Sequence, residues 1–281
     1  MKKKVIVCII ISALIFATME VALKIAGTSL DPFQMTFLRF FIGGVVLLPV
    51  GIGELRKNRT KLNVRLILHL ILLGFICVPL SMILFQYGVM NSNASTAAVI
   101  FCVNPMFTAF FAHFLNKNDK LSLLKIISLV TAVPGIILLI RPWDMQAGNT
   151  PQGVLLTLGA AALFALYSVL GTRTIGTVGA FAQTSMSFLF GSAMLLVLLF
   201  ALRKPVLSGL ADNLPEILYL GIVVTGAGYL FYFLAIRYSN ATTGSVTFLL
   251  KPAMAPVIAV IVLHEHIAWT TTIGIVFILA A

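Results

Sequence analysis

The chain has 281 residues, of which 60% are hydrophobic and only 10% are charged. Soluble domains carry roughly 25% charged residues, so this composition excludes a soluble enzyme, a nucleic-acid-binding domain and a disordered tail. The formal net charge of +11 does not indicate nucleic-acid binding, because lysine and arginine cluster between apolar segments, where membrane topology places them. The composition therefore predicts an all-α, polytopic integral membrane protein.

Apolar windows predict ten transmembrane helices, since about 20 residues are needed to cross the hydrocarbon core as a helix. In chain order the windows are residues 5–26, 33–52, 64–88, 94–115, 121–140, 152–172, 180–202, 215–236, 241–263 and 267–281. The glycine-rich segment 171–179 is interpreted as a hinge or a plain flexible loop. The last window is short, so it is expected to end within the headgroups or to continue in a tail beyond this sequence.

Basic residues predict the orientation of the chain in the membrane. Lys2–Lys4, the cluster from Arg56 to Arg65, Lys117 and Lys120 flank alternate windows on one side. The opposite loops, 27–32 and 88–93, contain no basic residue. We therefore expect a multi-pass protein of the cell (plasma) membrane with a cytoplasmic N-terminus.

The chain is predicted to contain two copies of a five-helix unit, at residues 1–145 and 150–281. A shift of 147 positions aligns the third and fourth windows with the eighth and ninth without a gap. It matches Ser92-Asn93-Ala94 with Ser239-Asn240-Ala241, and Pro105 with Pro252. Because five is odd, the second copy must be inverted relative to the first. Inverted repeats place a substrate site near the membrane midplane and permit alternating access.

Charged residues inside the windows cost about 2.5–3.5 kcal/mol each on insertion scales, so each indicates a function or a partner. Lys251 lies deep in the ninth window directly before Pro252, and Asn104-Pro105 is its repeat-related counterpart. A proline removes a backbone donor and frees carbonyl groups, so both positions are predicted to be breaks that face each other. Lys251 and Asn104 are candidate substrate-binding residues. The alternative is that Lys251 forms a structural ion pair with Glu20.

Glu20 is an acid well inside the first window, and it is a candidate for both substrate binding and proton coupling. The alternative is a local ion pair with Lys24, one helical turn away. Arg39 lies at a similar depth in the second window and is a candidate coupling or gating residue or a partner of Glu20. Further candidate substrate-binding residues, chosen for their hydrogen-bonding groups, are Gln86, Tyr167 and Tyr232.

A set of short motifs accompanies the repeat. Phe37-Leu38-Arg39-Phe40 opens the second window, and Leu47-Leu48-Pro49 closes it. The two Ser-Asn-Ala turns precede windows that each contain a proline, and Asp119 and Glu265 follow these windows. This pattern resembles the EamA-like members of the drug/metabolite transporter superfamily over essentially the whole chain. The resemblance implies a ten-span fold and the transport of solutes, mostly by export or exchange.

These observations predict a secondary transporter of a small polar metabolite, amino acid-like or related, that exports or exchanges it by alternating access. Proton coupling through Glu20 is part of the hypothesis. The alternatives are a channel or lipid scramblase on the same scaffold and, less favoured, an intramembrane enzyme, which needs a paired nucleophile and base. We expect no catalytic residue, no cofactor, no metal ion and no nucleic acid. The expected partners are a small-molecule substrate and the lipid bilayer, with a monomer or a homodimer left open.

Overall fold

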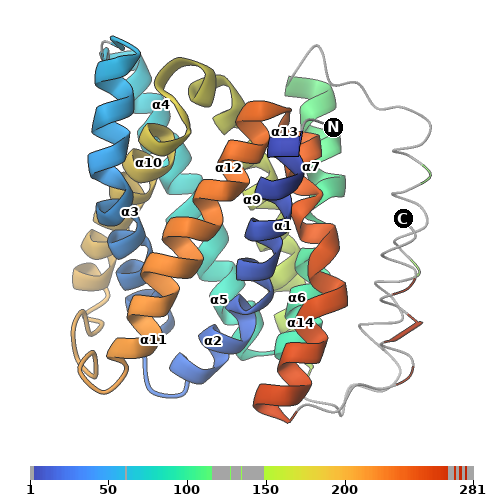
Figure 1. Ribbon diagram of the computed structural model, residues 1–281. Coiled ribbons are helices and arrows are strands. Elements are labelled where there is room, and N and C mark those ends of the chain that lie inside the picture. The colour runs from blue at the N-terminus through green and yellow to red at the C-terminus, as the bar shows by residue number, and fades with distance from the viewer. Residues whose placement is uncertain are drawn as a thin grey trace.

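The computed structural model describes residues 3–60, 62–115 and 149–264, together with the single residues 127, 134, 269, 272, 273 and 276. Within these residues every regular element is a helix and no strand occurs. Eight helical segments are long and apolar enough to cross a membrane, which makes the chain a multi-pass membrane protein (Figure 1). They are Lys3–Ala26, Pro32–Lys57, Val64–Met90, Ala94–Leu115, Pro151–Val178, Ala180–Ala201, Leu214–Tyr238 and Ala241–Leu263.

These eight segments correspond to eight of the ten predicted windows, and the windows 121–140 and 267–281 lie outside the described residues. The prediction of a loop or hinge over 171–179 is wrong for most of that segment. Helix α9 (Pro151–Val178) continues through it, and α10 (Ala180–Ala201) begins after Gly179, whose φ is 98°. Burial of Thr174, Ile175 and Val178 outweighs the helix penalty of a glycine, which is about 1 kcal/mol.

Three of the crossing segments are interrupted by short turns. Thr18 separates α1 (Lys3–Ala17) from α2 (Met19–Ala26), and Val246 separates α13 (Ala241–Ser245) from α14 (Thr247–Leu263). Cys102 and Val103 separate α6 (Ala94–Phe101) from α7 (Asn104–Leu115). Interrupted helices leave backbone groups that neighbouring elements or a ligand must satisfy.

Two crossing segments contain π-helical turns. One consists of α4 (Val64–Phe75), η1 (Ile76–Met82) and α5 (Ile83–Met90), and the other of α11 (Leu214–Leu218), η2 (Tyr219–Gly228) and α12 (Tyr229–Tyr238). The shift of 147 positions found in the sequence superimposes most of η1 on η2 and the first residue of α6 on that of α13. π-Helical turns are rare and often occur at functional sites. The two aligned segments therefore share their backbone irregularities as well as their residues.

The aligned segments cross the molecule in opposite directions. In Figure 1 the chain runs downward from α4 to α5 and upward from α11 to α12. It runs upward from α6 to α7 and downward from α13 to α14. The N-terminus lies at the end of the molecule where α3 (Pro32–Lys57) ends and α4 begins.

The centre of the helix bundle is filled by aromatic side chains. The largest fully buried rings are Phe16, Phe40, Phe85, Phe101, Phe164, Tyr167, Phe188, Tyr229, Tyr232, Phe233 and Phe248. The outward faces are apolar as well, with exposed side chains such as Leu14, Val45, Leu68, Leu155 and Phe200. An outer surface of this composition is suited to contact with lipid tails.

Candidate functional site

A buried ion pair connects two helices that are far apart in the sequence. Lys251 Nζ, in α14, donates to Glu20 Oε1, at the start of α2. The side chains are 0% and 1% exposed, respectively. Glu20 lies two residues after the turn at Thr18, and Lys251 lies five residues after the turn at Val246. The pair therefore lies close to two of the three helix interruptions.

The partner of Glu20 was open among Lys24, Arg39 and Lys251, and the structure selects Lys251. Lys24 Nζ donates to the backbone oxygen of Ser92 at 2.6 Å. Arg39 Nη1 contacts Met19 Sδ at 3.8 Å. Glu20 Oε2 has no hydrogen-bond partner, so half of the carboxylate is unused within the buried site.

Aromatic rings surround the Lys251 ammonium group. Its nitrogen lies 5.7 Å from the centroid of Phe101 and 6.0 Å from that of Phe248. Phe16 stacks on Phe248 with the centroids 5.6 Å apart. A cation within about 6 Å of a ring face is attracted to its negative side, so these two rings add favourable contacts to the ammonium group.

Asn104 is fully buried, and both polar atoms of its side chain form hydrogen bonds. Asn104 Nδ2 donates to the carbonyl oxygen of Ala161 in α9 at 2.9 Å, and the hydroxyl of Thr108 donates to Asn104 Oδ1 at 3.2 Å. The first bond ties α7 to α9, and the second lies within α7. Asn104 thus has a packing role in this conformation, and no direct hydrogen bond joins it to Lys251.

The sequence predicts helix breaks at Asn104-Pro105 and at Lys251-Pro252, and the structure has a break at the first position but not at the second. The chain turns at Cys102 and Val103, directly before Asn104, as expected. In the ninth window the turn lies at Val246, and α14 continues from Thr247 through Lys251 and beyond. Proline is tolerated within membrane helices where neighbouring elements satisfy the freed backbone groups, which explains why the second break is displaced.

Tyr167 and Tyr232 lie on either side of Phe164, with ring centroids 5.7 and 5.6 Å from its own. Tyr167 Oη accepts a hydrogen bond from Gln183 Nε2 and also contacts Ser187 Oγ, each at 3.1 Å. Tyr232 Oη donates to Ser168 Oγ at 2.9 Å. Both predicted residues are therefore in the central aromatic cluster, and Tyr232 approaches the ion pair through Phe248, 5.3 Å away.

Gln86 and Arg39 are fully buried residues with unused polar atoms. Among the described residues, neither Gln86 Nε2 nor Gln86 Oε1 has a hydrogen-bond partner, and the same is true of Arg39 Nε and Nη2. The guanidinium carbon of Arg39 lies 4.7 Å from the centroid of Phe40. Buried polar groups are normally satisfied, so these two side chains are unusual and are candidates for ligand contact.

A second polar cluster, which the sequence analysis does not predict, lies at the end of the molecule that contains the N-terminus. Glu54, near the end of α3, forms an ion pair with Arg237 of α12. Its Oε2 also accepts hydrogen bonds from the backbone N–H groups of Phe181 (2.9 Å) and Ala182 (3.3 Å), in the first turn of α10. A carboxylate at a helix N-terminus is favourable for the helix dipole. One side chain thus joins three helices.

We expect Glu54→Gln to lower the stability of the protein by about 1–2 kcal/mol, the range of a lost N-terminal cap, because the ion pair with Arg237 is lost and the remaining acceptor is uncharged. The measurement is the melting temperature of the purified protein in detergent. Asp212→Asn, at an exposed loop position, is the matched control. Equal melting temperatures for wild type and Glu54→Gln would show that the cluster does not hold these helices together.

The opposite end of the molecule is held by polar contacts between the α2–α3 turn and the segment that connects α10 with α11. Lys204 Nζ lies 2.5 Å from Asp31 Oδ2, Ser29 Oγ donates to Asn213 Oδ1 at 2.7 Å, and Gln34 Nε2 donates to the Ser208 carbonyl oxygen at 2.7 Å. The hydrogen bond to Asp31 raises the pKa of Lys204 above its usual value. Lys204 therefore stays charged at neutral pH and keeps its ion pair with Asp31.

No group of three histidine, cysteine or acidic residues suited to a metal ion occurs among the described residues. The three cysteines, Cys8, Cys77 and Cys102, are buried free thiols.

Membrane-crossing helices that enclose an ion pair and unsatisfied polar groups are typical of multi-pass membrane transporters. The sequence profile of the EamA-like transporter family matches residues 3–141 and again residues 151–281. The chain belongs to this family, which is part of the drug/metabolite transporter superfamily. Its members are transporters and not enzymes, so the chain has a small-molecule substrate.

Individual proteins resemble the chain over most of its length. An uncharacterized transporter of Clostridium kluyveri is 34% identical, covering 99% of this chain and 91% of its own. A protein of Rickettsia prowazekii named S-adenosylmethionine uptake transporter is 24% identical, covering 93% and 85%. A solved crystal structure superimposes with a TM-score of 0.72 at 16% identity and covers 100% of this chain and 95% of its own. This last similarity shows the fold alone.

Proposed function

We propose that the protein is a secondary transporter that exports or exchanges a small polar metabolite, amino acid-like or related, by alternating access. In this proposal ten helices form two inverted five-helix repeats, residues 1–145 and 150–281, in the plasma membrane with the N-terminus in the cytoplasm. Lys251, Glu20, Asn104, Gln86, Tyr167 and Tyr232 contact the substrate at stages of the cycle. Glu20 and Arg39 act in coupling or gating.

Three observations support the inverted repeat. The family profile matches the chain twice, over residues 3–141 and 151–281. The aligned segments share their π-helical turns and the position at which α6 and α13 begin. They also cross the molecule in opposite directions (Figure 1). A chain with an inverted repeat has two conformations of similar energy, open to opposite sides, which is the basis of alternating access.

The observation that carries the proposal is the ion pair between Glu20 and Lys251. It joins the first half to the second at a depth where water is excluded, with exposures of 1% and 0%. A substrate that competes with Lys251 for the Glu20 carboxylate would release the two halves from each other. A proton that neutralises Glu20 would have the same effect, and competition between the two is the requirement for proton-coupled exchange.

The polar contacts at the two ends of the bundle are consistent with alternating access. The Glu54 cluster joins α3 to α10 and α12 at one end, and the Asp31–Lys204 pair joins α3 to the segment after α10 at the other. Alternating access requires one of these sets to open while the other remains closed. Both sets are formed at once among the described residues, so in this scheme the opening of either end requires one set to break.

Reconstitution into proteoliposomes tests the proposal. Amino acids and other small metabolites are screened for uptake with and without an inward proton gradient, with wild type, Glu20→Gln and the control Arg203→Met, which removes an exposed charge. We expect saturable uptake by wild type and the control. We expect Glu20→Gln to retain exchange between the two sides but to lose its response to the gradient.

Other outcomes would contradict specific parts of the proposal. Flux that does not saturate with solute concentration would indicate a channel or a lipid scramblase on the same scaffold. A Glu20→Gln variant that responds to the gradient like wild type would remove Glu20 from coupling. If wild type takes up none of the tested amino acids and small metabolites, the proposal that it transports such a solute is wrong.

A further inference from the structure

Arg39 is a buried cation that forms no hydrogen bond or ion pair with an anion among the described residues. Its side chain is fully buried, and its Nη1 contacts only the thioether sulfur of Met19, at 3.8 Å. Nε and Nη2 have no hydrogen-bond partner. A thioether is a weak acceptor, and a buried charge without a hydrogen-bonded counter-charge is strongly unfavourable. Packing alone therefore does not explain a guanidinium group at this buried position.

The two unused donors of Arg39 lie on one edge of the guanidinium plane. The hydrogens on Nε and Nη2 point in the same direction, with a spacing that matches the two oxygens of a carboxylate. The third nitrogen, Nη1, is directed to Met19. The edge that remains is therefore the one suited to side-on, bidentate binding of a carboxylate.

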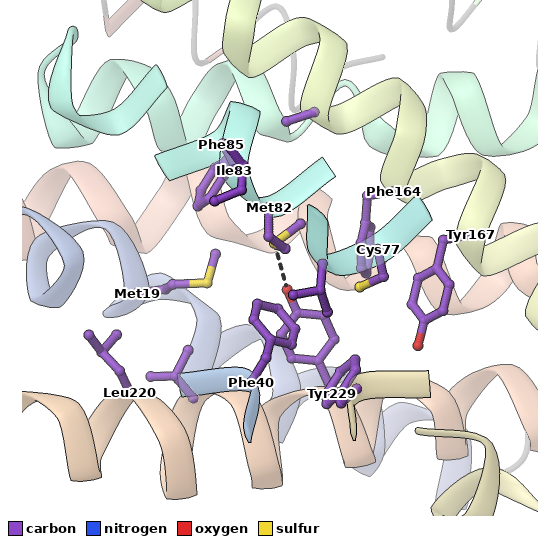
Figure 2. Close-up of a cluster of buried hydrophobic side chains, with 14 of the residues drawn as sticks. Met19, Phe40, Cys77, Met82, Ile83, Phe85, Phe164, Tyr167, Leu220 and Tyr229 are labelled. Atoms are coloured by element: carbon purple, nitrogen blue, oxygen red, sulfur yellow. Dashed lines mark hydrogen bonds between the residues drawn. The ribbon is translucent and has the colours of Figure 1, made fainter. Parts of the chain in front are cut away.

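The neighbours of Arg39 include an aromatic ring and a thioether group, and the Glu20 carboxylate also acts on it electrostatically. Phe40, over whose ring the guanidinium lies, belongs to the buried cluster drawn in Figure 2 together with Met19, Met82 and Tyr229. The hydroxyl of Tyr229 donates to Met82 Sδ at 3.3 Å. Methionine side chains are flexible and adapt to irregular shapes, so this lining fits an aliphatic substituent better than a second charge.

An unused acceptor occurs at the residue that follows Met19. Glu20 Oε1 accepts from Lys251, whereas Glu20 Oε2 is buried without a partner. The same region of the core thus offers two donors on Arg39 and one acceptor on Glu20. A molecule that carries a carboxylate and, on the adjacent carbon, an N–H or O–H donor complements all three.

We propose that Arg39 binds the carboxylate of the transported solute through Nε and Nη2, and that Glu20 Oε2 accepts a hydrogen bond from its α-substituent. The substrate class is an α-amino or α-hydroxy monocarboxylate with an aliphatic side chain. This assignment rests on the transport function proposed above and gives Arg39 a direct role in substrate binding in addition to gating.

Four compounds with one carbon skeleton test the assignment in a binding measurement on the purified protein in detergent. They are leucine, 2-hydroxy-4-methylpentanoate, 4-methylpentanoate, which lacks the α-donor, and leucinamide, which lacks the carboxylate. We expect the first two to bind, 4-methylpentanoate to bind more weakly and leucinamide not to bind. A preference for the amino or the hydroxy compound decides between the two substituents.

Three variants locate the carboxylate. Arg39→Met should weaken leucine or hydroxy-acid binding by about 10- to 100-fold, the range for a lost hydrogen bond between charged groups. Arg39→Lys should be intermediate, because an ammonium group cannot form the side-on pair. The control Arg203→Met should bind like wild type. Equal affinity of Arg39→Met and wild type, or no binding of either α-substituted acid to wild type, would overturn the assignment.

The stability of the ligand-free protein separates binding from a structural role. If Arg39 serves the ligand, Arg39→Met removes an unpaired buried charge and raises the melting temperature. If Arg39 holds Met19 and Phe40 in place, the same change lowers it, and the assignment is wrong. Transport in proteoliposomes distinguishes the two claims. If wild type and Arg39→Met transport leucine at equal rates, Arg39 does not bind the substrate, but the protein is still a transporter. If wild type transports no solute at all, the proposed transport function itself is contradicted.

Discussion

Lys251→Met is expected to destabilise the protein by about 3–5 kcal/mol, because it leaves the Glu20 carboxylate buried without its hydrogen-bonded cation. Both side chains are at most 1% exposed, so water cannot replace the lost partner. Glu20→Gln should cost a comparable amount, since the Lys251 ammonium then loses its counter-charge and keeps only its aromatic neighbours. The measurement is the free energy of unfolding in mixed micelles for each variant.

The double variant Glu20→Gln/Lys251→Met should recover most of this loss. Replacing both members of a buried ion pair by uncharged groups of similar size is often neutral or stabilising, whereas breaking the pair is not. The difference between the double change and the sum of the single changes gives the interaction energy of the pair. A double variant no more stable than either single variant would show that the pair does not account for the loss.

Transport by the double variant distinguishes a structural pair from a functional one. A pair that only holds α2 against α14 becomes dispensable once stability is restored, so the double variant would transport like wild type. A pair that binds the solute or a proton remains essential, so the double variant would fold and fail to transport. We expect the second result, with Arg203→Met as the control for the removal of a cation.

The location of most helices follows from hydrophobicity alone, because the membrane requires long apolar segments. Residues 94–115 and 241–263, for example, match the observed segments at both ends. The end of α9 was predicted too early, since Gly171, Gly176 and Gly179 suggested a loop. Glycine is a weak helix breaker when buried neighbours hold the chain, and of the three only Gly179 leaves the helix.

The candidate site was predictable in its residues but not in its pairing. Charges within apolar windows are rare, so Glu20, Arg39 and Lys251 stand out in the sequence. Which cation reaches Glu20 depends on how distant helices are arranged, and local spacing favoured Lys24 as strongly as any other. The same limit applies to Asn104, whose predicted contact with the substrate competes with its observed bond to Ala161.

The role of Glu54 cannot be predicted from its neighbours in the sequence. It lies beside Arg56, Lys57 and Arg59, so it looks like an ordinary charge at a membrane surface. Its partners, Arg237 and the first turn of α10, are more than a hundred positions away. The detectable signal was Gly179 immediately before a helix start without an acidic or hydroxyl cap, which leaves N–H groups that need an acceptor.

Gly74→Ala is expected to destabilise the protein by about 1–3 kcal/mol, the usual cost of overpacking. Gly74 in α4 and Gly191 in α10 bring two backbones into direct contact. A Cβ at Gly74 would overlap the carbonyl oxygen of Ser187 and lie 2.7 Å from the Gly191 nitrogen, and one at Gly191 would lie 2.5 Å from the Gly74 oxygen. Because these obstacles are backbone atoms, the two helices would have to separate.

Gly53→Ala and Gly176→Ala are the matched controls, since nothing lies within 4 Å of a Cβ at either position. Both glycines lie in helices, so alanine there should be neutral or stabilising by up to about 1 kcal/mol. Melting temperatures of the four proteins in one detergent provide the comparison, and a Gly74→Ala variant as stable as these controls would contradict close backbone packing.

The same substitution links packing to transport. The α4 helix belongs to the first proposed repeat and α10 to the second. In the proposed transport cycle, Gly74 and Gly191 therefore lie where the two halves move against each other. Small residues permit such close contact between membrane helices. We therefore expect Gly74→Ala to reduce the rate of solute exchange as well as the stability, with both controls transporting like wild type. Loss of stability with an unchanged exchange rate would show that the two halves do not move at this contact.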